Sequence, residues 1–274
     1  MKYKNSKEYM GSNKRLWNEM TPIHVKSDTY AVDEFKKGKD SLHCVEIEEV
    51  GDVTGKALLH LQCHFGLDSL SWARRGAKVT GVDFSDKAIS FAKNLSNEIE
   101  VNADFICSNI CELDKQLKGD FDIVYTSYGV LAWLPDIAEW ARIVSHFVKP
   151  GGFFYIVEFH PFSHVFADEN VQDLKVHYPY FQGKQPLYFP PGPTYADKNS
   201  HLENPSYEWQ HTIGDIVTSL IDHGLSIKFL HEFPFSVYEG LPFLVKGDDG
   251  LWYLPDGRED IPLLFSLKAH KEET

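Results

Sequence analysis

Hydrophobic and polar positions between residues 56 and 159 follow two alternating patterns. Compact apolar runs of strand length occur at residues 56–63, 78–84, 104–110, 121–128 and 153–159. Segments that place apolar side chains on one helical face lie between some of them, at residues 67–76, 85–98 and 136–148. Ser85 predicts an N-cap for the second helix, and Gly76 ends the first. Strands that alternate with helices predict right-handed βαβ units, and hence an α/β fold with a parallel sheet covered on both faces.

The last quarter of the chain changes this rhythm. Residues 212–224 predict a helix that Thr212 caps and Gly224 ends, and residues 225–233 predict a sixth strand. A seventh strand is predicted at residues 261–269, and no helical pattern separates it from the sixth. Two strands joined without a crossover helix pair antiparallel or lie apart.

Residues 160–210 have no helix or strand periodicity and are rich in Pro, Tyr, Phe and His. So long an irregular stretch inside a domain favours a functional cover over a plain connector. We therefore expect residues 1–274 to form one domain, with residues 1–55 as an N-terminal helical arm and residues 160–210 as a lid-like insertion. An aromatic insertion also suits a dimer interface, so a homodimer stays open.

Composition narrows the function classes. The formal net charge is −13 and no stripe of Lys or Arg offsets it, which argues against a nucleic acid partner. The polar N-terminus predicts no secretory leader, and no run approaches the roughly 20 apolar residues of a membrane span. The four cysteines predict free thiols and a cytoplasmic location. The cysteines and histidines do not follow a zinc-ligand spacing, so no metal is predicted.

The stretch LLHLQCHFGLDSL, residues 58–70, predicts a buried strand that runs directly into a helix. A bend of this kind often cradles a nucleotide, and it usually contains several glycines because they supply unusual backbone angles and close approach. Here Gly66 is the only glycine, and Gln62 and His64 stand where small residues are expected.

The order of elements from about Lys56 to Lys268 resembles the class I S-adenosylmethionine-dependent methyltransferases. That family has a doubly wound, seven-stranded, mostly parallel, Rossmann-like sheet with an antiparallel seventh strand beside strand five. Its first motif is hydrophobic-Asp-hydrophobic-Gly-x-Gly-x-Gly, in which His60 here replaces the acid while Gln62 and His64 replace two glycines. The sequence LHLQCHFG, residues 59–66, resembles the variant first motif of a bacterial subgroup of the superfamily. The resemblance implies S-adenosyl-L-methionine as cofactor, S-adenosyl-L-homocysteine as product and a small-molecule acceptor.

The resemblance also implies cofactor-binding residues. Asp83 ends the second strand, where a carboxylate accepts both ribose hydroxyl protons; an N-cap or a surface acid is the alternative. Phe84 would lie along the adenine ring, Asn109 would bind the adenine amino group or simply form a turn, and Ile110 would pack on the ring. The first motif contributes Leu61, Gln62, Cys63, His64 and Gly66. Without the glycines, the turn is either wider or binds the cofactor through the side chains of Gln62 and His64; we favour the second.

Thr126, Ser127 and Tyr128 follow the fourth strand, at the family's position nearest the reactive methyl group, and form a β-to-α loop in the alternative reading. Candidate catalytic residues are Tyr128, Glu158 and His160, with His164 just beyond. Aromatic side chains that would build an apolar acceptor pocket are Trp17, Tyr30, Tyr178, Tyr180, Phe181, Tyr188, Phe189 and Tyr195.

Two other functions stay open at this point. An NAD-dependent oxidoreductase shares the strand–turn–helix and the acid after strand two, although its pyrophosphate site needs the missing glycines. A non-catalytic S-adenosylmethionine-binding or regulatory module would explain the altered first motif.

Overall fold

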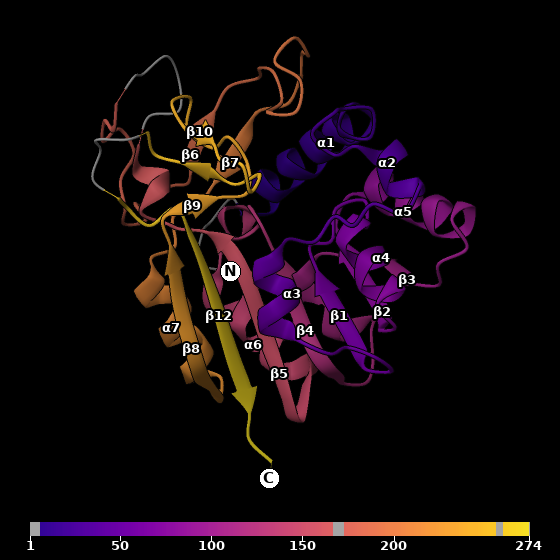
Figure 1. Ribbon diagram of the computed structural model, residues 1–274. Coiled ribbons are helices and arrows are strands. Elements are labelled where there is room, and N and C mark those ends of the chain that lie inside the picture. Colours follow the sequence, from indigo (N-terminus) through magenta and orange to yellow (C-terminus); the bar gives the residue numbers. More distant parts are fainter. Residues whose placement is uncertain (1–5, 167–172, 256–259, 274) are drawn as a thin grey trace.

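The computed structural model describes residues 6–166, 173–255 and 260–273 (Figure 1). Its main sheet has seven strands in the order β3-β2-β1-β4-β5-β12-β8, and β12 runs antiparallel to both of its neighbours. The strands are β1 (Ala57–Leu61), β2 (Lys78–Asp83), β3 (Asp104–Cys107), β4 (Phe121–Ser127), β5 (Val148–Phe159), β8 (Leu225–Phe233) and β12 (Leu264–Lys271). The prediction of a doubly wound, mostly parallel sheet with an antiparallel last strand is confirmed.

Helices cover both faces of this sheet. One face carries α3 (Cys44–Val50), α4 (Leu67–Arg74) and α5 (Asp86–Glu98), and the other carries η1 (Ile110–Lys115), α6 (Ile137–Phe147) and α7 (Ile213–Asp222). Strand residues alternate between the faces, as the period of two requires: Leu59 and Leu61 pack with α6, while Leu58 packs with α3. Each face therefore has its own apolar core.

The predicted helix starts follow from their capping side chains. Ser85 Oγ accepts the N–H of Ala88 at 3.1 Å, and Asp136 Oδ1 accepts the N–H of Glu139 at 3.3 Å. Thr212 caps α7 and exchanges hydrogen bonds with an acid three residues on. Each of these side chains satisfies a backbone N–H that has no partner within the helix.

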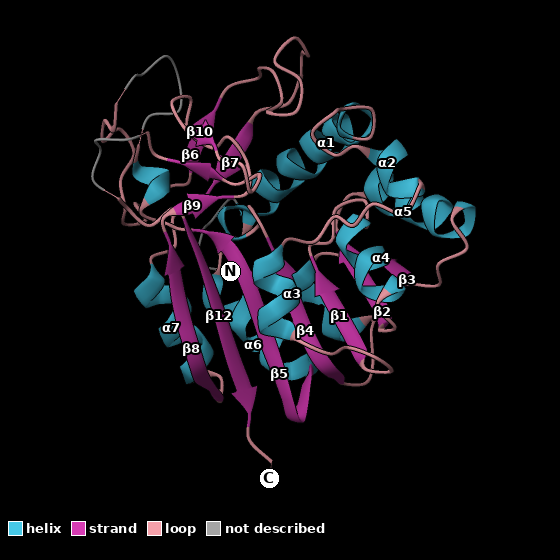
Figure 2. Cartoon of the chain, viewed as in Figure 1, coloured by secondary structure: helices cyan, strands magenta, loops and turns pink. Residues whose placement is uncertain are grey.

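A cover lies over the carboxyl ends of the parallel strands (Figures 1 and 2). It contains α1 (Ser6–His24), α2 (Val32–Lys36), the short helices η2 (Leu131–Trp133) and η3 (Ser163–Val165), and the strands β6 (Leu187–Phe189), β7 (Ser206–Glu208), β9 (Phe235–Ser236), β10 (Val245–Lys246) and β11 (Trp252–Tyr253). Strand β6 pairs with β7, which packs against α1, so the insertion is tied to the N-terminal arm.

Within the cover, the insertion packs against the segment between β8 and β12, a contact that the sequence patterns did not indicate. Val165 and Phe166 share a buried apolar cluster with Leu241, Leu244 and Leu263. The residues between β8 and β12, in which no helical pattern was found, contribute the three-stranded sheet β10-β11-β9. Two-residue strands are too short for alternation to reveal them.

The KPGG sequence is another difference. The fifth strand was predicted to begin at residue 153, but KPGG (residues 149–152) lies within β5, where Gly151 has φ +76° and the pairing with β4 shifts register between Phe121 and Ile123. A side chain at Gly152 would lie 2.8 Å from the carbonyl oxygen of Asp122. The glycines therefore form a bulge at the start of the strand. Among the residues described, no helix is both long enough and apolar enough to span a bilayer.

One buried acid joins the N-terminal arm to the sheet. Glu46 in α3 is fully shielded from solvent; its carboxylate accepts the N–H of His43 at 2.9 Å and the hydroxyl of Tyr128 at 2.7 Å. Burial raises the pKa of Glu46 to about 8, against the lowering effect of the His43 hydrogen bond. The folded protein therefore holds this carboxyl protonated over a pH range in which the unfolded chain has lost the proton.

We predict that Glu46→Gln makes the protein more stable than the parent at pH 9. A group whose pKa is raised by folding destabilises the fold as pH rises from its unfolded value, near 4.5, through about 8. Glutamine does not ionise, so the variant should gain about 2–4 kcal/mol relative to the parent over this range, since one pKa unit is about 1.4 kcal/mol. Urea unfolding at pH 5 and pH 9 measures the difference. Parallel stability curves for the two proteins would show that Glu46 is not protonated in the fold.

Candidate functional site

The 62–66 loop, which joins β1 to α4, turns through three left-handed residues. Gln62 has φ +58°, His64 has φ +49° and Gly66 has φ +86°. These are the positions where the resemblance leads one to expect glycine, and φ in this range is the conformation that glycine adopts without strain. The turn therefore keeps the backbone angles of a glycine-rich loop, and the wider-turn alternative has no support in these angles.

Packing explains why a glycine remains at position 66 alone. A Cβ atom built on Gly66 would lie 2.8 Å from the Phe105 ring and 3.0 Å from Ala92, so any side chain there meets two buried residues. The side chains of Gln62 and His64, by contrast, are half-buried. A left-handed non-glycine residue costs about 1–2 kcal/mol, and the surrounding contacts must offset this cost.

Hydrogen bonds hold the strained loop in place. Gln62 Nε2 donates to the carbonyl of Val130 at 2.8 Å, and the backbone N–H of Cys63 donates to Val82 at 2.9 Å. The backbone N–H of His64 donates to Asp83 Oδ2 at 2.9 Å. The loop is thus tied on one side to the end of β2 and on the other to the residues after β4.

Asp83 is buried at the carboxyl end of β2. Its second oxygen, Oδ1, accepts the backbone N–H of Ser85 at 2.8 Å, and burial raises the pKa of Asp83 to about 7. The surface-acid alternative is excluded by this burial, and the cap of α5 is Ser85 itself. A buried carboxyl with two backbone donors keeps further lone pairs for a ligand hydroxyl.

The residue that stands in place of the motif's acid, His60, is uncharged at neutral pH. His60 is buried, its Nδ1 lies 2.8 Å from Ser69 Oγ, and burial lowers its pKa to about 3. A nearby acid that the sequence analysis missed is Asp68 in α4, which accepts the hydroxyls of Ser127 at 3.0 Å and Ser41 at 2.7 Å. Burial raises the pKa of Asp68. No sequence pattern singles out Asp68, because acids in a first helical turn are common.

The predicted adenine residues have mixed placements. Asn109 Oδ1 accepts the N–H of Cys111 at 3.1 Å and so caps η1, which is the turn-residue role. Ile110 and Leu61 are buried, and Phe84 is half-buried directly after Asp83. The structure brings Asp83 and the 62–66 loop together, whereas the amide oxygen of Asn109 is engaged by its own helix.

The residues after β4 are fixed by one carboxylate. Glu158 at the end of β5 accepts the backbone N–H groups of Gly129, Val130 and Leu131, the last two at 2.8 and 3.2 Å, and also that of Phe159 at 2.7 Å. Four backbone donors leave this carboxylate little capacity as a base, although burial raises its pKa. The structure favours a role for Glu158 in holding the 129–131 loop.

The other candidate catalytic residues are also engaged. His160 is buried; its Nδ1 accepts the N–H of Phe162 at 3.1 Å and its Nε2 lies 2.9 Å from Glu232 Oε1. Burial lowers the pKa of His160, against the opposing effect of Glu232. Tyr128 donates its hydroxyl to Glu46, as described above. Thr126 is buried within β4, in register with Leu61.

Part of the predicted aromatic pocket surrounds His64. Trp17 packs edge-on with its ring centroid 5.0 Å from that of His64, and Tyr30 lies at 5.6 Å. Tyr195 donates or accepts a short hydrogen bond with Tyr30 and packs on His24, a residue that the sequence analysis missed. The other predicted aromatics lie elsewhere in the cover: Tyr178 with Phe189, Tyr180 with Phe181, and Tyr188 with Tyr207. Phe181 is largely exposed, so it does not line a pocket.

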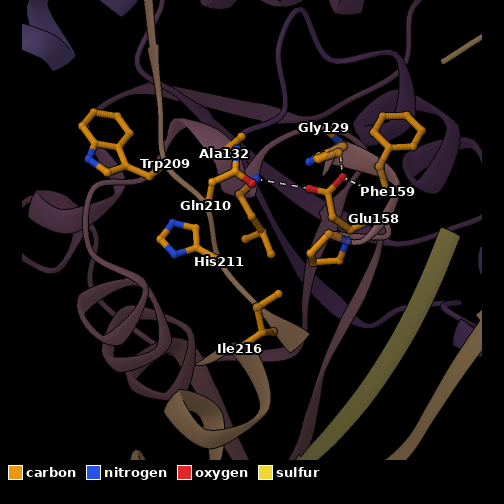
Figure 3. A pocket seen from close by; sticks show the side chains of 11 residues that line it. Gly129, Ala132, Glu158, Phe159, Trp209, Gln210, His211 and Ile216 are labelled. Atoms are coloured by element: carbon orange, nitrogen blue, oxygen red, sulfur yellow. Dashed lines mark hydrogen bonds between the residues drawn. The ribbon is translucent and has the colours of Figure 1, made fainter. Parts of the chain in front are cut away.

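A recess opens beside the 129–131 loop (Figure 3). It is a shallow depression, whose space of about 320 Å³ includes solvent at its open mouth. Its walls are Gly129, Leu131, Ala132, Glu158, Phe159, Pro161, His164, Trp209, Gln210, His211 and Ile216. Figure 3 shows Trp209 and His211 across the recess from Glu158 and Phe159. Within the described ranges, no group of three or more His, Cys, Asp or Glu side chains is arranged to hold a metal ion.

Comparison with known proteins places this arrangement in context. Residues 58–152 match a family model described as a methyltransferase domain. The ubiquinone biosynthesis O-methyltransferase of Bordetella pertussis is 34% identical over 122 residues, which are 44% of this chain and 50% of that protein. That of Saccharophagus degradans is 35% identical over 123 residues, 44% of this chain and 52% of the relative. The chain spans about half the length of the curated relatives it matches.

Solved structures resemble the chain over nearly its whole length. The CcbJ methyltransferase of Streptomyces caelestis superposes with a TM-score of 0.62 at 12% identity, covering 94% of this chain and 99% of that one. An S-adenosylmethionine-dependent methyltransferase from Clostridium acetobutylicum gives a TM-score of 0.55 at 14% identity, covering 92% and 96%. At these identities the likeness shows the fold alone.

We predict that Gly66→Ala destabilises the protein by about 2–4 kcal/mol. The left-handed angle costs about 1–2 kcal/mol and the overlap with Phe105 a similar amount. The matched control is Gln62→Gly, which removes backbone strain and one hydrogen bond of about 1 kcal/mol, so its net effect should stay within about 1 kcal/mol. Urea unfolding of the three proteins measures this. A Gly66→Ala protein as stable as the parent would contradict the packing argument.

Proposed function

Because the chain belongs to the class I S-adenosylmethionine-dependent methyltransferase superfamily, we propose that it transfers the methyl group of S-adenosyl-L-methionine to a small-molecule acceptor. The observation that carries the proposal is the 62–66 loop, with three left-handed residues and a backbone N–H bonded to Asp83. This is the element that holds a nucleoside in such folds. The region of family similarity, residues 58–152, contains both the loop and Asp83.

The residues present fit this cofactor. Within the described part of the chain, the donors to the Asp83 carboxylate are backbone N–H groups, which leaves lone pairs for the two ribose hydroxyls. Around the loop, several shielded polar atoms have no hydrogen-bond partner among the described residues, including Gln62 Oε1 and His64 Nδ1. Buried polar atoms normally have partners, so a polar ligand is the simplest explanation for these atoms. Phe84 and Ile110 would border the adenine.

When bound, S-adenosyl-L-methionine supplies a sulfonium whose methyl carbon is the electrophile. The protein's task is to align the acceptor in line with that bond and to exclude water. The cover of α1 and the insertion suits water exclusion, because Trp17, His24 and Tyr30 enclose His64. Glu158 serves alignment by fixing the 129–131 loop, which contacts Gln62 on one side and lines the recess on the other.

We place the acceptor in the recess of Figure 3. Its walls are mainly apolar, and His164, Gln210 and His211 supply polar groups for orientation, as in most small-molecule sites. The names of the curated relatives favour an oxygen nucleophile. Most residues that wall the recess lie outside residues 58–152, the region of the family match, so those residues would select the acceptor. The net charge of −13 disfavours an anionic polymer.

The two alternative functions receive less support. An NAD-dependent oxidoreductase needs backbone N–H groups that converge on a pyrophosphate, whereas the N–H of His64 is already bonded to a carboxylate. A module that had lost the cofactor would have no reason to keep two non-glycine residues in strained left-handed angles.

We predict that S-adenosyl-L-homocysteine binds more tightly as pH rises through about 7. The pKa of Asp83 is raised to about 7 by burial, and the ionised carboxylate is the stronger acceptor for ribose hydroxyls. Binding at pH 6 should therefore release up to one proton. Calorimetry at pH 6 in two buffers of different ionisation enthalpy measures that release.

Asp83→Asn is the control for this prediction, because the amide cannot release a proton. Asp83→Ala should weaken binding by about 1.5–3 kcal/mol, the usual range for hydrogen bonds to a charged group. Proton release that persists in Asp83→Asn would assign the titration to another group. Binding of a nicotinamide cofactor in place of S-adenosyl-L-homocysteine would refute the proposed function.

We predict that Ala132→Phe abolishes turnover while leaving cofactor binding within twofold of the parent. Ala132 lines the recess, and a phenyl ring there would occupy the space of the acceptor. The matched control is Ala138→Phe on the exposed face of α6. Transfer of labelled methyl groups to a panel of small phenols, amines and thiols measures turnover. Full activity in Ala132→Phe would place the acceptor elsewhere.

A further inference from the structure

Four buried polar atoms around the 62–66 loop lack partners among the described residues. They are Trp17 Nε1, Gln62 Oε1, His64 Nδ1 and Thr126 Oγ1. The first and third belong to rings 5.0 Å apart, and Thr126 is in register with Leu61, the residue before Gln62. Unpaired buried polar atoms are uncommon in folded proteins, and a group of them at one place indicates a missing polar ligand.

A chain of hydrogen bonds determines which kind of group His64 presents. Thr194 Oγ1 lies 2.6 Å from His24 Nε2, and His24 Nδ1 lies 3.1 Å from His64 Nε2. Thr194 Oγ1 also accepts the N–H of Ala196 at 3.3 Å, so its own proton is available for His24. If Thr194 donates to His24 and His24 donates to His64, the proton of His64 lies on Nδ1.

The opposite direction of the chain satisfies fewer groups. In that direction, His24 and His64 both carry their proton on Nε2. The Thr194 hydroxyl proton then has no acceptor among the described residues, and the lone pair of His64 Nδ1 has no donor. Burial lowers the pKa of His24 to about 4 and holds the pKa of His64 well below its usual range, so both rings are neutral at pH 7. The first direction, with a single unpaired N–H at His64, is therefore favoured.

The unpaired atoms then divide by kind. His64 Nδ1–H and Trp17 Nε1–H are donors on adjacent rings, and each needs an acceptor. Gln62 Oε1 is an acceptor whose orientation is set, because the amide nitrogen of the same side chain donates to Val130. A set of two donors and one acceptor around one loop matches a zwitterion, which carries a carboxylate and an ammonium. The amino acid end of S-adenosyl-L-methionine has this chemistry.

We propose that Thr194 and His24 hold His64 as an N–H donor, that His64 and Trp17 bind the cofactor's carboxylate, and that Gln62 Oε1 binds its ammonium. This proposal rests on the proposed function and adds the groups that bind the amino acid end of S-adenosyl-L-methionine. Trp17 comes from α1 and Thr194 from the insertion, so the cover takes part in cofactor recognition. His24 and Thr194 act through His64 and are positioning residues.

The test compares two ligands that share adenosine but differ at the amino acid end. S-adenosyl-L-homocysteine carries the zwitterion, and 5′-methylthioadenosine lacks it. Trp17→Phe should weaken S-adenosyl-L-homocysteine at least tenfold and leave 5′-methylthioadenosine within twofold, by calorimetry. Thr194→Val should weaken binding of S-adenosyl-L-homocysteine about three- to tenfold and leave 5′-methylthioadenosine unaffected. Thr194→Ser should keep the parent affinity because it retains the hydroxyl.

Nitrogen-15 NMR of the histidine rings reads the hydrogen-bond chain without any ligand. His24 and His64 should both carry their proton on Nδ1 in the parent, and Thr194→Val should shift them toward a mixture of tautomers. The matched control is Tyr195→Phe, on the same part of the cover, whose hydroxyl bonds Tyr30. It should leave the tautomers and the preference between the ligands unchanged.

Several outcomes would overturn the proposal. These are an equal loss of both ligands in Trp17→Phe, no loss of either, or Nε2 protons on both histidines of the parent. A parent protein that binds neither ligand would refute the proposed function and this proposal with it. A parent that binds both ligands, with variants that keep its preference, would refute only the carboxylate and ammonium assignments.

Discussion

The constraint on which the site depends is the left-handed conformation of the 62–66 loop, held by the hydrogen bond from His64 N–H to Asp83 at 2.9 Å. Because Gln62 and His64 carry side chains, their left-handed backbone conformation costs about 1–2 kcal/mol each. The strain persists because the loop is bonded at both sides and because Gly66 fits against Phe105 with no room for a Cβ. The loop is thus rigid without being glycine-rich, and its side chains become available for recognition.

Electrostatics in this region follow from burial. The histidines close to the loop are neutral, since burial lowers the pKa values of His24, His60 and His64. The acids Asp68 and Asp83 have raised pKa values for the same reason. A site with neutral rings and buried carboxyls has little positive charge of its own, which suits a cofactor that brings a sulfonium and an ammonium.

Glu158 links the two halves of the site. Its carboxylate fixes the 129–131 loop, whose Val130 carbonyl anchors Gln62 and whose Gly129 and Leu131 line the recess. The proposed cofactor and acceptor regions therefore share this short segment, and backbone hydrogen bonds set their relative position. Such alignment is the main requirement of an in-line transfer.

The sequence by itself determined the sheet, its strand types and the helix caps, because apolar periodicity and capping are local signals. It also located Asp83 and the altered loop, since residues at strand ends are adjacent along the chain to the strands that position them. It did not determine what surrounds His64: Trp17, His24 and Thr194 come from two segments that only folding brings together. Nor did it reveal that Glu158 is saturated by backbone donors, because hydrogen bonds between β5 and the loop after β4 leave no pattern in either segment. Contacts between residues distant in sequence are selected by packing and burial, and these are properties of the tertiary structure alone.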